Sequence, residues 1–133
     1  EIAEVSTLTG AVVIGLGDQM GGVMSKDKDL LERLLTSAHK AGEDMWPLPF
    51  HWRLEAHNKS SVAGTRNIGS LEGHAGAITA YLFIAASAKN TPYVHCDIAG
   101  PTSASKPWGV HPEGATGFGV MTAVQFVLDI PRV

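Results

Sequence analysis

The sequence has little of several features that mark specialised classes of protein. Cys96 is the only cysteine in the 133 residues, which excludes a disulfide framework and a cysteine-rich zinc module. A single cysteine fits a reducing, cytoplasmic compartment. No apolar run approaches the roughly 18–20 residues of a membrane-spanning helix. The formal net charge is −3, so we expect neither nucleic acid nor a membrane surface as a partner.

What the chain does have is enough apolar sequence to build a core. It is 44% hydrophobic and 17% charged, which is typical of one compact domain. It contains no repeat and no low-complexity tract, so we expect residues 1–133 to have no internal boundary. The chain opens at Glu1 directly into a strand-like segment. This opening suggests a piece of a longer protein; a processed end that falls inside a strand is the alternative.

The apolar periodicity predicts alternating strands and helices. We expect strands at 2–9 (buried), 23–25 and 93–99, and helices at 27–41, 75–88 and 117–128. Residues 11–16 fit a short helix or a strand, and residues 51–58 fit a further helix. The two prolines in 45–50 (MWPLPF) exclude a helix and predict an extended segment on the core. We expect loops at 59–74 and 100–114. The pattern predicts an α/β fold: a mixed, largely parallel sheet with helices on both faces.

The strand at 93–99 carries the residues closest to metal or nucleophile chemistry. His95 and Asp97 are two residues apart, so their side chains share one face of the strand. The pair offers two metal ligands without a third, and a hydrogen-bonded polar pair or a polar cluster at the sheet end is the favoured interpretation. Cys96 points to the opposite face, where a buried, structural thiol is expected.

The other candidate is the glycine-rich segment GATGFG (114–119), which precedes a helix. Backbone N–H groups there could face an anion, but the spacing is not that of a dinucleotide-binding loop. A tight turn with close helix packing is the favoured interpretation. Most of the thirteen carboxylates lie in hydrophilic stretches, where we expect them to be solvated. The residues alone therefore predict an α/β domain without an active site of its own.

Six ordered segments span nearly the whole chain: STLTGA (6–11), MWPLPF (45–50), RNIG (66–69), AGAITAYLF (75–83), HCDIAG (95–100) and GATGFGV (114–120). In this order they resemble motifs of the cytosolic leucyl aminopeptidase family of dinuclear metallopeptidases. The resemblance implies that residues 1–133 are the C-terminal portion of the family's catalytic domain. One departure is Met121, where many members carry arginine.

The resemblance also implies an activity, which is removal of the N-terminal amino acid from a peptide substrate. Two divalent metals, zinc or manganese, polarise the scissile carbonyl and activate water in this family. Their carboxylate ligands and the catalytic lysine precede the segment that opens here. We therefore expect the chain alone to hold no metal and no catalytic residue, and to depend on the upstream part of the same protein. Family members form homo-hexamers in the cytoplasm.

Positions that carry over from the family are limited to the substrate cleft. Three match strand-end residues whose backbone lines the substrate, and three match the wall of the pocket for the first side chain: Thr7, Leu8 and Gly10, then Ile68, Ala99 and Thr102. We expect a Cβ at Gly10 to meet the substrate or to force a strained φ. Thr102 stands where some relatives are more apolar.

Two other functions remain open from the sequence. The first is a family member that no longer catalyses and acts as a structural or interaction protein. The second is DNA binding, which some bacterial relatives have and which a net charge of −3 does not support. The presence or absence of the upstream metal ligands discriminates the first from an enzyme.

Overall fold

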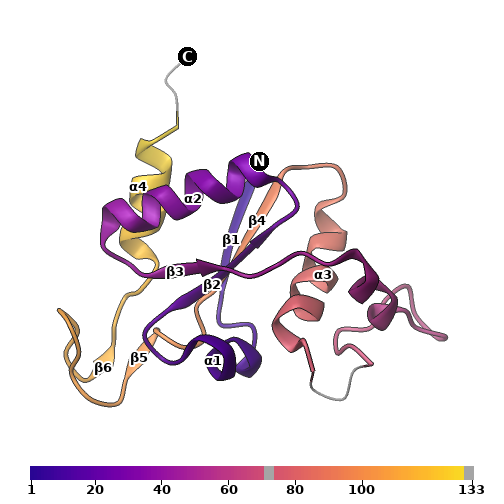
Figure 1. Cartoon of the computed structure of the whole chain (residues 1–133), viewed down its shortest axis with the longest axis horizontal. Helices are drawn as coiled ribbons and strands as arrows, with labels where there is room; N and C mark the ends of the chain where they lie inside the picture. Colours follow the sequence, from indigo (N-terminus) through magenta and orange to yellow (C-terminus); the bar gives the residue numbers. More distant parts are fainter. Residues whose placement is uncertain (71–73, 131–133) are drawn as a thin grey trace.

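The structure is a computed structural model that describes residues 1–70 and 74–130. The elements that shape the chain run in the order β1 (Ile2–Ser6), α1 (Gly10–Leu16), β2 (Gly21–Ser25), α2 (Lys28–Ala41), β3 (Met45–Pro47), a 3-10 helix η1 (Trp52–Asn58), α3 (Gly76–Ala88), β4 (Tyr93–Asp97), β5 (Ser103–Ala104), β6 (Gly114–Ala115) and α4 (Val120–Leu128). Figure 1 shows these elements along the chain.

Four strands form the central sheet in the order β1-β4-β2-β3. β1 pairs with β4 in parallel and β2 pairs with β3 in parallel, whereas β2 and β4 are antiparallel. The register of the β1–β4 pair places Ser6 beside Asp97 at the carboxyl ends of both strands. The predicted mixed, largely parallel sheet is confirmed.

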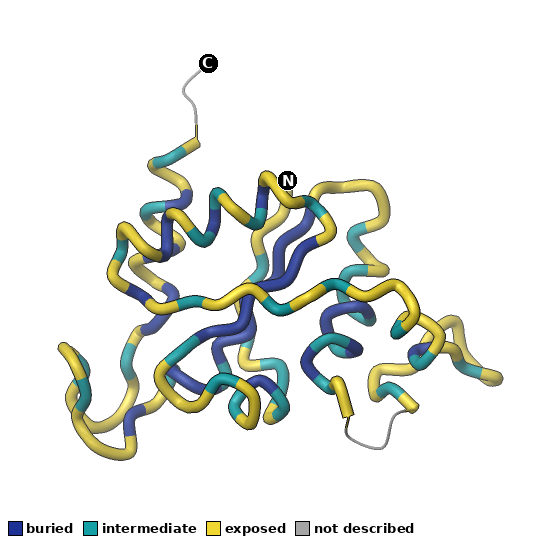
Figure 2. The backbone as a smooth tube through the Cα atoms, in the orientation of Figure 1, coloured by how far each residue is buried: buried dark blue, intermediate teal, exposed yellow. Residues whose placement is uncertain are grey.

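Helices cover both faces of this sheet, as predicted, and each face has its own core. On one face α2 and α4 pack side by side over Val94, Cys96 and Ile98. On the other face α1 and α3 pack over Met24 and Tyr93. Figure 2 shows the central strands as the buried spine between the two layers. The alternation of side chains along β4 thus separates the two cores.

The helix α2 ends where the sequence predicts. The Asp27 side chain accepts a hydrogen bond from the backbone N–H of Leu30, which caps the amino end. Gly42 closes the carboxyl end with φ 73°, in the left-handed region that glycine adopts without strain. Residues 11–16, left open between helix and strand, belong to helix α1. Residues 51–58 form the 3-10 helix η1.

The predicted buried strand at 2–9 is wrong in two respects. β1 ends at Ser6, and it lies at the edge of the sheet, where Val5 is 44% exposed. Alternation of apolar residues showed a strand but could not show how many neighbours that strand has. Figure 2 shows β1 less buried than the strands beside it.

Two further segments differ from expectation. The loop predicted at 100–114 contains β5, which pairs antiparallel with β6, because two-residue strands have no periodicity to detect. The segment 45–50 is extended, but Trp46 is 58% exposed because β3 is the other edge of the sheet. In the described part of the loop 59–74 there is no helix or strand after η1; its residues 71–73 lie outside the described range.

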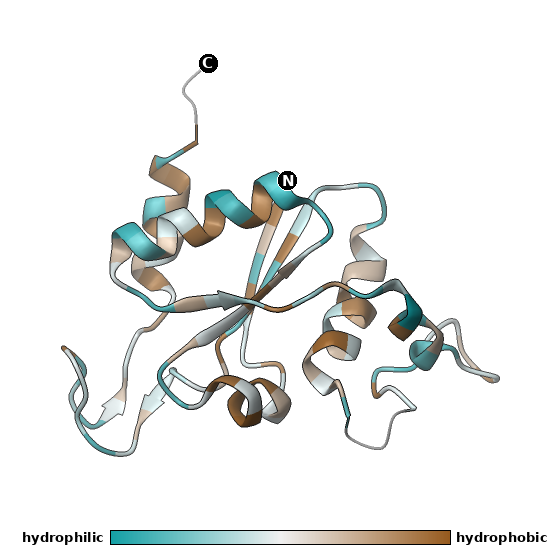
Figure 3. Ribbon diagram, viewed as in Figure 1, coloured by the Kyte–Doolittle hydropathy of each residue, from teal (hydrophilic) through white to brown (hydrophobic). Residues whose placement is uncertain are grey.

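The helix α4 presents an apolar stripe to solvent. Val120, Val124 and Val127 are at least half exposed and recur at helical spacing. Figure 3 shows the hydrophobic residues along this helix. The face of α4 that meets α2 carries Phe126, which lies in the core. Among residues 1–70 and 74–130, no helix is long and apolar enough to cross a membrane.

Candidate functional site

The carboxyl ends of β1 and β4 meet at one edge of the sheet. Because the two strands are parallel and neighbours, the segments that leave them, 7–10 and 98–102, start side by side. The backbone N–H of Ile98 donates to the carbonyl of Ser6 at 2.9 Å and extends the pairing one step beyond the strands. Ligands of α/β sheets bind outside the carboxyl ends of the strands, so this edge is the candidate site.

Asp97 organises this edge. Its side chain is fully buried, at 0% exposure. One carboxylate oxygen accepts hydrogen bonds from the backbone N–H groups of Leu8 at 3.1 Å, Thr9 at 3.4 Å and Ala99 at 3.3 Å. The other oxygen accepts the hydroxyl of Thr9 at 2.7 Å. One carboxylate therefore ties both strand-end segments together, and the sheet-end polar cluster favoured for Asp97 is confirmed.

The same contacts fix the start of α1. The Thr9 hydroxyl donates to Asp97 and accepts the backbone N–H of Val12 at 3.0 Å, so Thr9 caps the helix. Gly10 is the first residue of α1, and a Cβ built there has open space around it. The backbone of Gly10 lies outside the left-handed region. The expected strain in φ at Gly10 is therefore wrong, whereas contact with substrate stays a prediction.

The 98–102 segment is held against the end of α1 by a close backbone approach. A Cβ on Gly100 would lie 2.4 Å from the carbonyl oxygen of Gly17, so only glycine fits. Thr116 holds the other side, because its hydroxyl donates to the Pro101 carbonyl and its N–H donates to the Thr102 carbonyl. These contacts set the position of two predicted pocket-wall residues, Ala99 and Thr102.

The sixth predicted contact residue lies on a separate loop. Ile68 is 74% exposed and belongs to the loop between η1 and α3. Asn58 anchors that loop by donating to the carbonyls of Arg66 and Thr79. The structure thus brings Thr7, Leu8, Gly10, Ala99 and Thr102 to one sheet edge, whereas Ile68 lies on a different segment and is not among the residues joined there.

Behind the strand ends, half-buried Glu4 pairs with fully buried His95 between β1 and β4. Glu4 accepts hydrogen bonds from the His95 ring and from the Tyr93 hydroxyl, the latter at 3.0 Å. Burial alone would raise the pKa of Glu4, but the hydrogen bonds from His95 and Tyr93 outweigh it and hold that pKa below its ordinary value. Burial, together with the neighbouring Glu4 charge, raises the pKa of Tyr93.

Cys96 behaves as predicted. It points into the core on the face opposite His95 and Asp97, and 1% of its surface is exposed. Burial and the Glu4 charge raise the pKa of the Cys96 thiol to about 12. The thiol is protonated at neutral pH and is not a nucleophile.

The glycine-rich segment 114–119 meets an anion that belongs to the chain itself. Buried Glu43 accepts the backbone N–H groups of Gly119 and Thr122, both at 2.8 Å, and the hydroxyl of Thr122 at 2.6 Å. Gly117 and Gly119 have φ of 70° and 92°, which makes the turn glycine-dependent. The favoured turn-and-packing interpretation is confirmed, and Glu43 is an exception to the expectation that most carboxylates are solvated. Glu43 and Gly119 lie 76 residues apart in sequence, so no local pattern could have shown their contact.

The described residues do not fit a metal centre. No group of three or more His, Cys, Asp or Glu side chains in the described ranges is arranged to hold a metal ion. Asp97 is engaged by backbone donors, and His95 bonds to Glu4 through Nδ1, while its buried Nε2 has no hydrogen-bond partner among the described residues. A zinc site with three or four protein ligands would have to take its ligands from outside the described residues.

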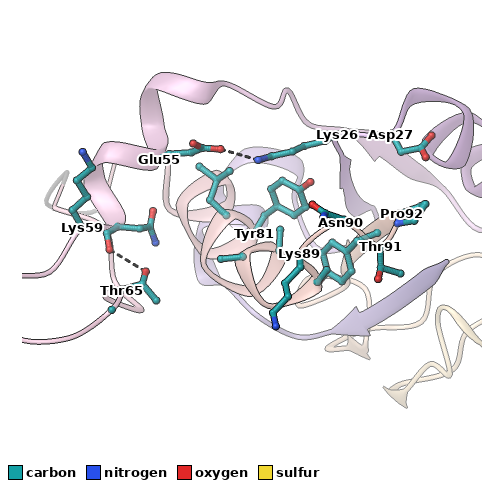
Figure 4. A pocket seen from close by; sticks show the side chains of 17 residues that line it. Lys26, Asp27, Glu55, Lys59, Thr65, Tyr81, Lys89, Asn90, Thr91 and Pro92 are labelled. Atoms are coloured by element: carbon teal, nitrogen blue, oxygen red, sulfur yellow. Dashed lines mark hydrogen bonds and ion pairs between the residues drawn. The ribbon is translucent and has the colours of Figure 1, made fainter.

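A cavity of about 700 Å³ lies at the opposite end of β4. Figure 4 shows Tyr81 among the side chains that line it, with the Lys26–Glu55 ion pair beside it, whose N–O distance is 2.8 Å. Thr91 and Tyr93, at the amino end of β4, also line it. None of the six predicted contact residues does. The cavity is therefore separate from the strand-end site.

Comparison with known proteins agrees with this geometry. Residues 1–124 match the cytosol aminopeptidase family, catalytic domain. The chain is 46% identical over 129 residues to a probable cytosol aminopeptidase of Persephonella marina, and 43% identical over 129 residues to one of Synechocystis. Both alignments cover at least 96% of this chain but only 26% of the relative. The chain thus spans about a quarter of the length of the curated relatives it matches.

Solved structures give the same result. A tomato leucine aminopeptidase mutant superposes with a TM-score of 0.87 and 34% identity, covering 96% of this chain and 24% of that one. The bottromycin maturation enzyme BotP in complex with Mn superposes with a TM-score of 0.88 and 32% identity, covering 94% and 28%. The strand-end site and both cores thus lie within a known catalytic fold. The chain belongs to the cytosol aminopeptidase family and is part of its catalytic domain.

Proposed function

We propose that this chain forms the substrate-contact edge of a metal-dependent leucyl aminopeptidase, which removes N-terminal amino acids from peptides. The observation that carries the proposal is the Asp97-centred junction of the segments after β1 and β4. It holds five of the six predicted contact residues at the carboxyl edge of parallel strands, where α/β folds bind their ligands.

The contact residues divide into two roles. The backbone of Thr7, Leu8 and Gly10 lines the peptide. The side chains of Ile68, Ala99 and Thr102 form the wall for the first side chain of the substrate. Ala99 and Thr102 are half-buried and fixed by the neighbouring turn. Thr102 adds a hydroxyl to this wall, and it donates to the Ala99 carbonyl at 3.4 Å, which leaves its methyl group as the apolar contact.

Two divalent metals, zinc or manganese, belong to the complete protein in this proposal. The family is metal-dependent, and the structural relative BotP is in complex with Mn. Because the described residues do not fit a metal centre, we assign the ligands to the rest of the protein. This chain contributes the positioning of the peptide.

We also propose that the complete protein is a cytoplasmic homo-hexamer. Its relatives are named cytosol aminopeptidases, and a single buried cysteine fits a reducing compartment. The apolar stripe of α4 and the open edge of β1 leave surface for other parts of the assembly to cover.

Turnover by the complete protein tests the function. Purified protein containing this chain, supplied with manganese or zinc, is expected to release leucine from leucine amide and from leucyl peptides with a free N-terminus. An N-acetylated peptide of the same sequence is the matched control and is expected to be resistant. Absence of turnover with either metal would instead support the alternative, a non-catalytic family member. No observation on the described residues favours that alternative.

A further inference from the structure

Asp97 is an unusual group to bury. Its carboxylate is fully buried, and it forms no salt bridge with any cation of the described residues. A buried carboxylate without a countercharge is costly unless hydrogen bonds stabilise it. Here three backbone N–H groups and one hydroxyl do so, and all four donors belong to the strand-end segments. The carboxylate therefore fixes the orientation of those peptide groups.

The orientation of an N–H group determines that of the carbonyl in the same peptide unit. In a trans peptide the two point in opposite directions, and the described chain contains no cis peptide bond. The N–H groups of Leu8 and Thr9 point to Asp97. The carbonyls of Thr7 and Leu8, which share those peptide units, therefore point away from Asp97. Neither carbonyl accepts a hydrogen bond from the described residues.

We infer that Asp97 is a positioning residue that turns the carbonyls of Thr7 and Leu8 toward the amide N–H of the peptide substrate. The inference rests on the proposed function, because it needs a peptide at this edge of the sheet. Unpaired backbone carbonyls accept hydrogen bonds from the N–H groups of the bound peptide in many peptide-binding proteins. Asp97 acts through the backbone and does not touch the substrate.

The Thr9 hydroxyl is the second part of the arrangement. It donates to Asp97 while accepting the N–H of Val12, so the carboxylate and the start of α1 hold the segment from both sides. An amide in place of the carboxylate keeps the shape but cannot accept the Thr9 hydroxyl on its nitrogen. It also replaces charge-assisted bonds by neutral ones, which are about half as strong. Asp97→Asn is therefore expected to loosen the orientation without opening a cavity.

The test compares a peptide with an ester analogue in the complete protein. Leucylglycine has one amide N–H, and the matched ester of leucine with glycolic acid has an oxygen at that position. Asp97→Asn is expected to lower kcat/KM for leucylglycine about tenfold, the effect of weakening one charge-assisted bond. The ester, which has no N–H to lose, is expected to change less than about twofold on the same grounds.

Thr9→Val and Thr9→Ser provide a second test that does not depend on the Asp97→Asn variant. Valine removes the hydroxyl and is expected to reproduce the peptide-selective loss, whereas serine keeps it and is expected to restore wild-type selectivity. Equal losses on peptide and ester in Asp97→Asn, or no loss in a folded Thr9→Val protein, would overturn the inference. Failure of the proposed function gives a different result, since wild-type protein would then cleave neither compound.

Discussion

Gly100→Ala tests whether the strand-end site depends on the close packing of 98–102 against the end of α1. The added Cβ would lie 2.4 Å from the Gly17 carbonyl oxygen and 3.3 Å from the Asp18 Cα. Both are backbone atoms, so no side-chain rotation can relieve the overlap and the backbone must shift. Overpacking of this kind costs about 1–3 kcal/mol. At roughly 2–4 °C per kcal/mol for a domain of about 150–250 residues, the melting midpoint of the complete protein should fall by several degrees.

Gly15→Ala is the matched control for that substitution. Gly15 lies inside α1, and a Cβ there meets nothing within 4 Å. Alanine in an exposed helix interior is favoured over glycine by about 0.5–1 kcal/mol, so this variant should melt at or slightly above the wild-type midpoint. Thermal scans of the two variants, with kcat/KM on leucylglycine measured alongside, check both expectations. A Gly100→Ala protein as stable and active as wild type would refute the reasoning.

Three further expectations follow from the structure. Gly10→Val in the complete protein should lower kcat/KM strongly while the melting midpoint changes little, because the Cβ meets nothing within 4 Å among the described residues; loss of folding with unchanged specific activity would refute the contact. Glu4→Gln concerns pH: since the folded pKa of Glu4 is lowered from about 4.5, its ionised form stabilises the protein above that pH and the contribution is lost as pH falls through the folded value. The melting midpoint of wild type should therefore converge on that of Glu4→Gln as the pH falls below about 4.5 and through the lowered pKa of Glu4, and a constant difference would contradict this. Finally, the isolated 133-residue chain should be poorly stable or associate, and Val124→Lys should reduce the association; sedimentation of wild type as a cooperative monomer would contradict it.

Local signals explain which parts of this fold could be predicted from sequence. The α2 helix was predictable because its cap Asp27 and its terminal Gly42 lie within its own segment. β4 was predictable as a strand because its short, largely apolar segment is bounded by turn signals in the sequence, which is typical of a buried strand. The family resemblance, carried by ordered motifs along the chain, identified the catalytic domain that the comparisons confirm.

What could not be predicted depends on contacts between residues far apart in sequence. Glu43 lies 76 residues from Gly119, and Asp97 lies 89 residues from Leu8. Most carboxylates were expected to be solvated, but folding encloses Glu43 between three donors. Asp97 was recognised as a polar group at a sheet end, but three of its four donors come from the segment after the other strand. Periodicity shows which residues share a face and not which groups meet there.

Metal stoichiometry tests most directly the claim that this chain positions the peptide while the rest of the protein holds the metals. Zinc and manganese would be measured by elemental analysis after gel filtration, for the 133-residue chain and for the complete protein. The account predicts no stoichiometric metal and no leucine-amide hydrolysis for the chain alone, and bound metal with turnover for the complete protein. Two tightly bound metals in the isolated chain, or turnover by it, would contradict the account.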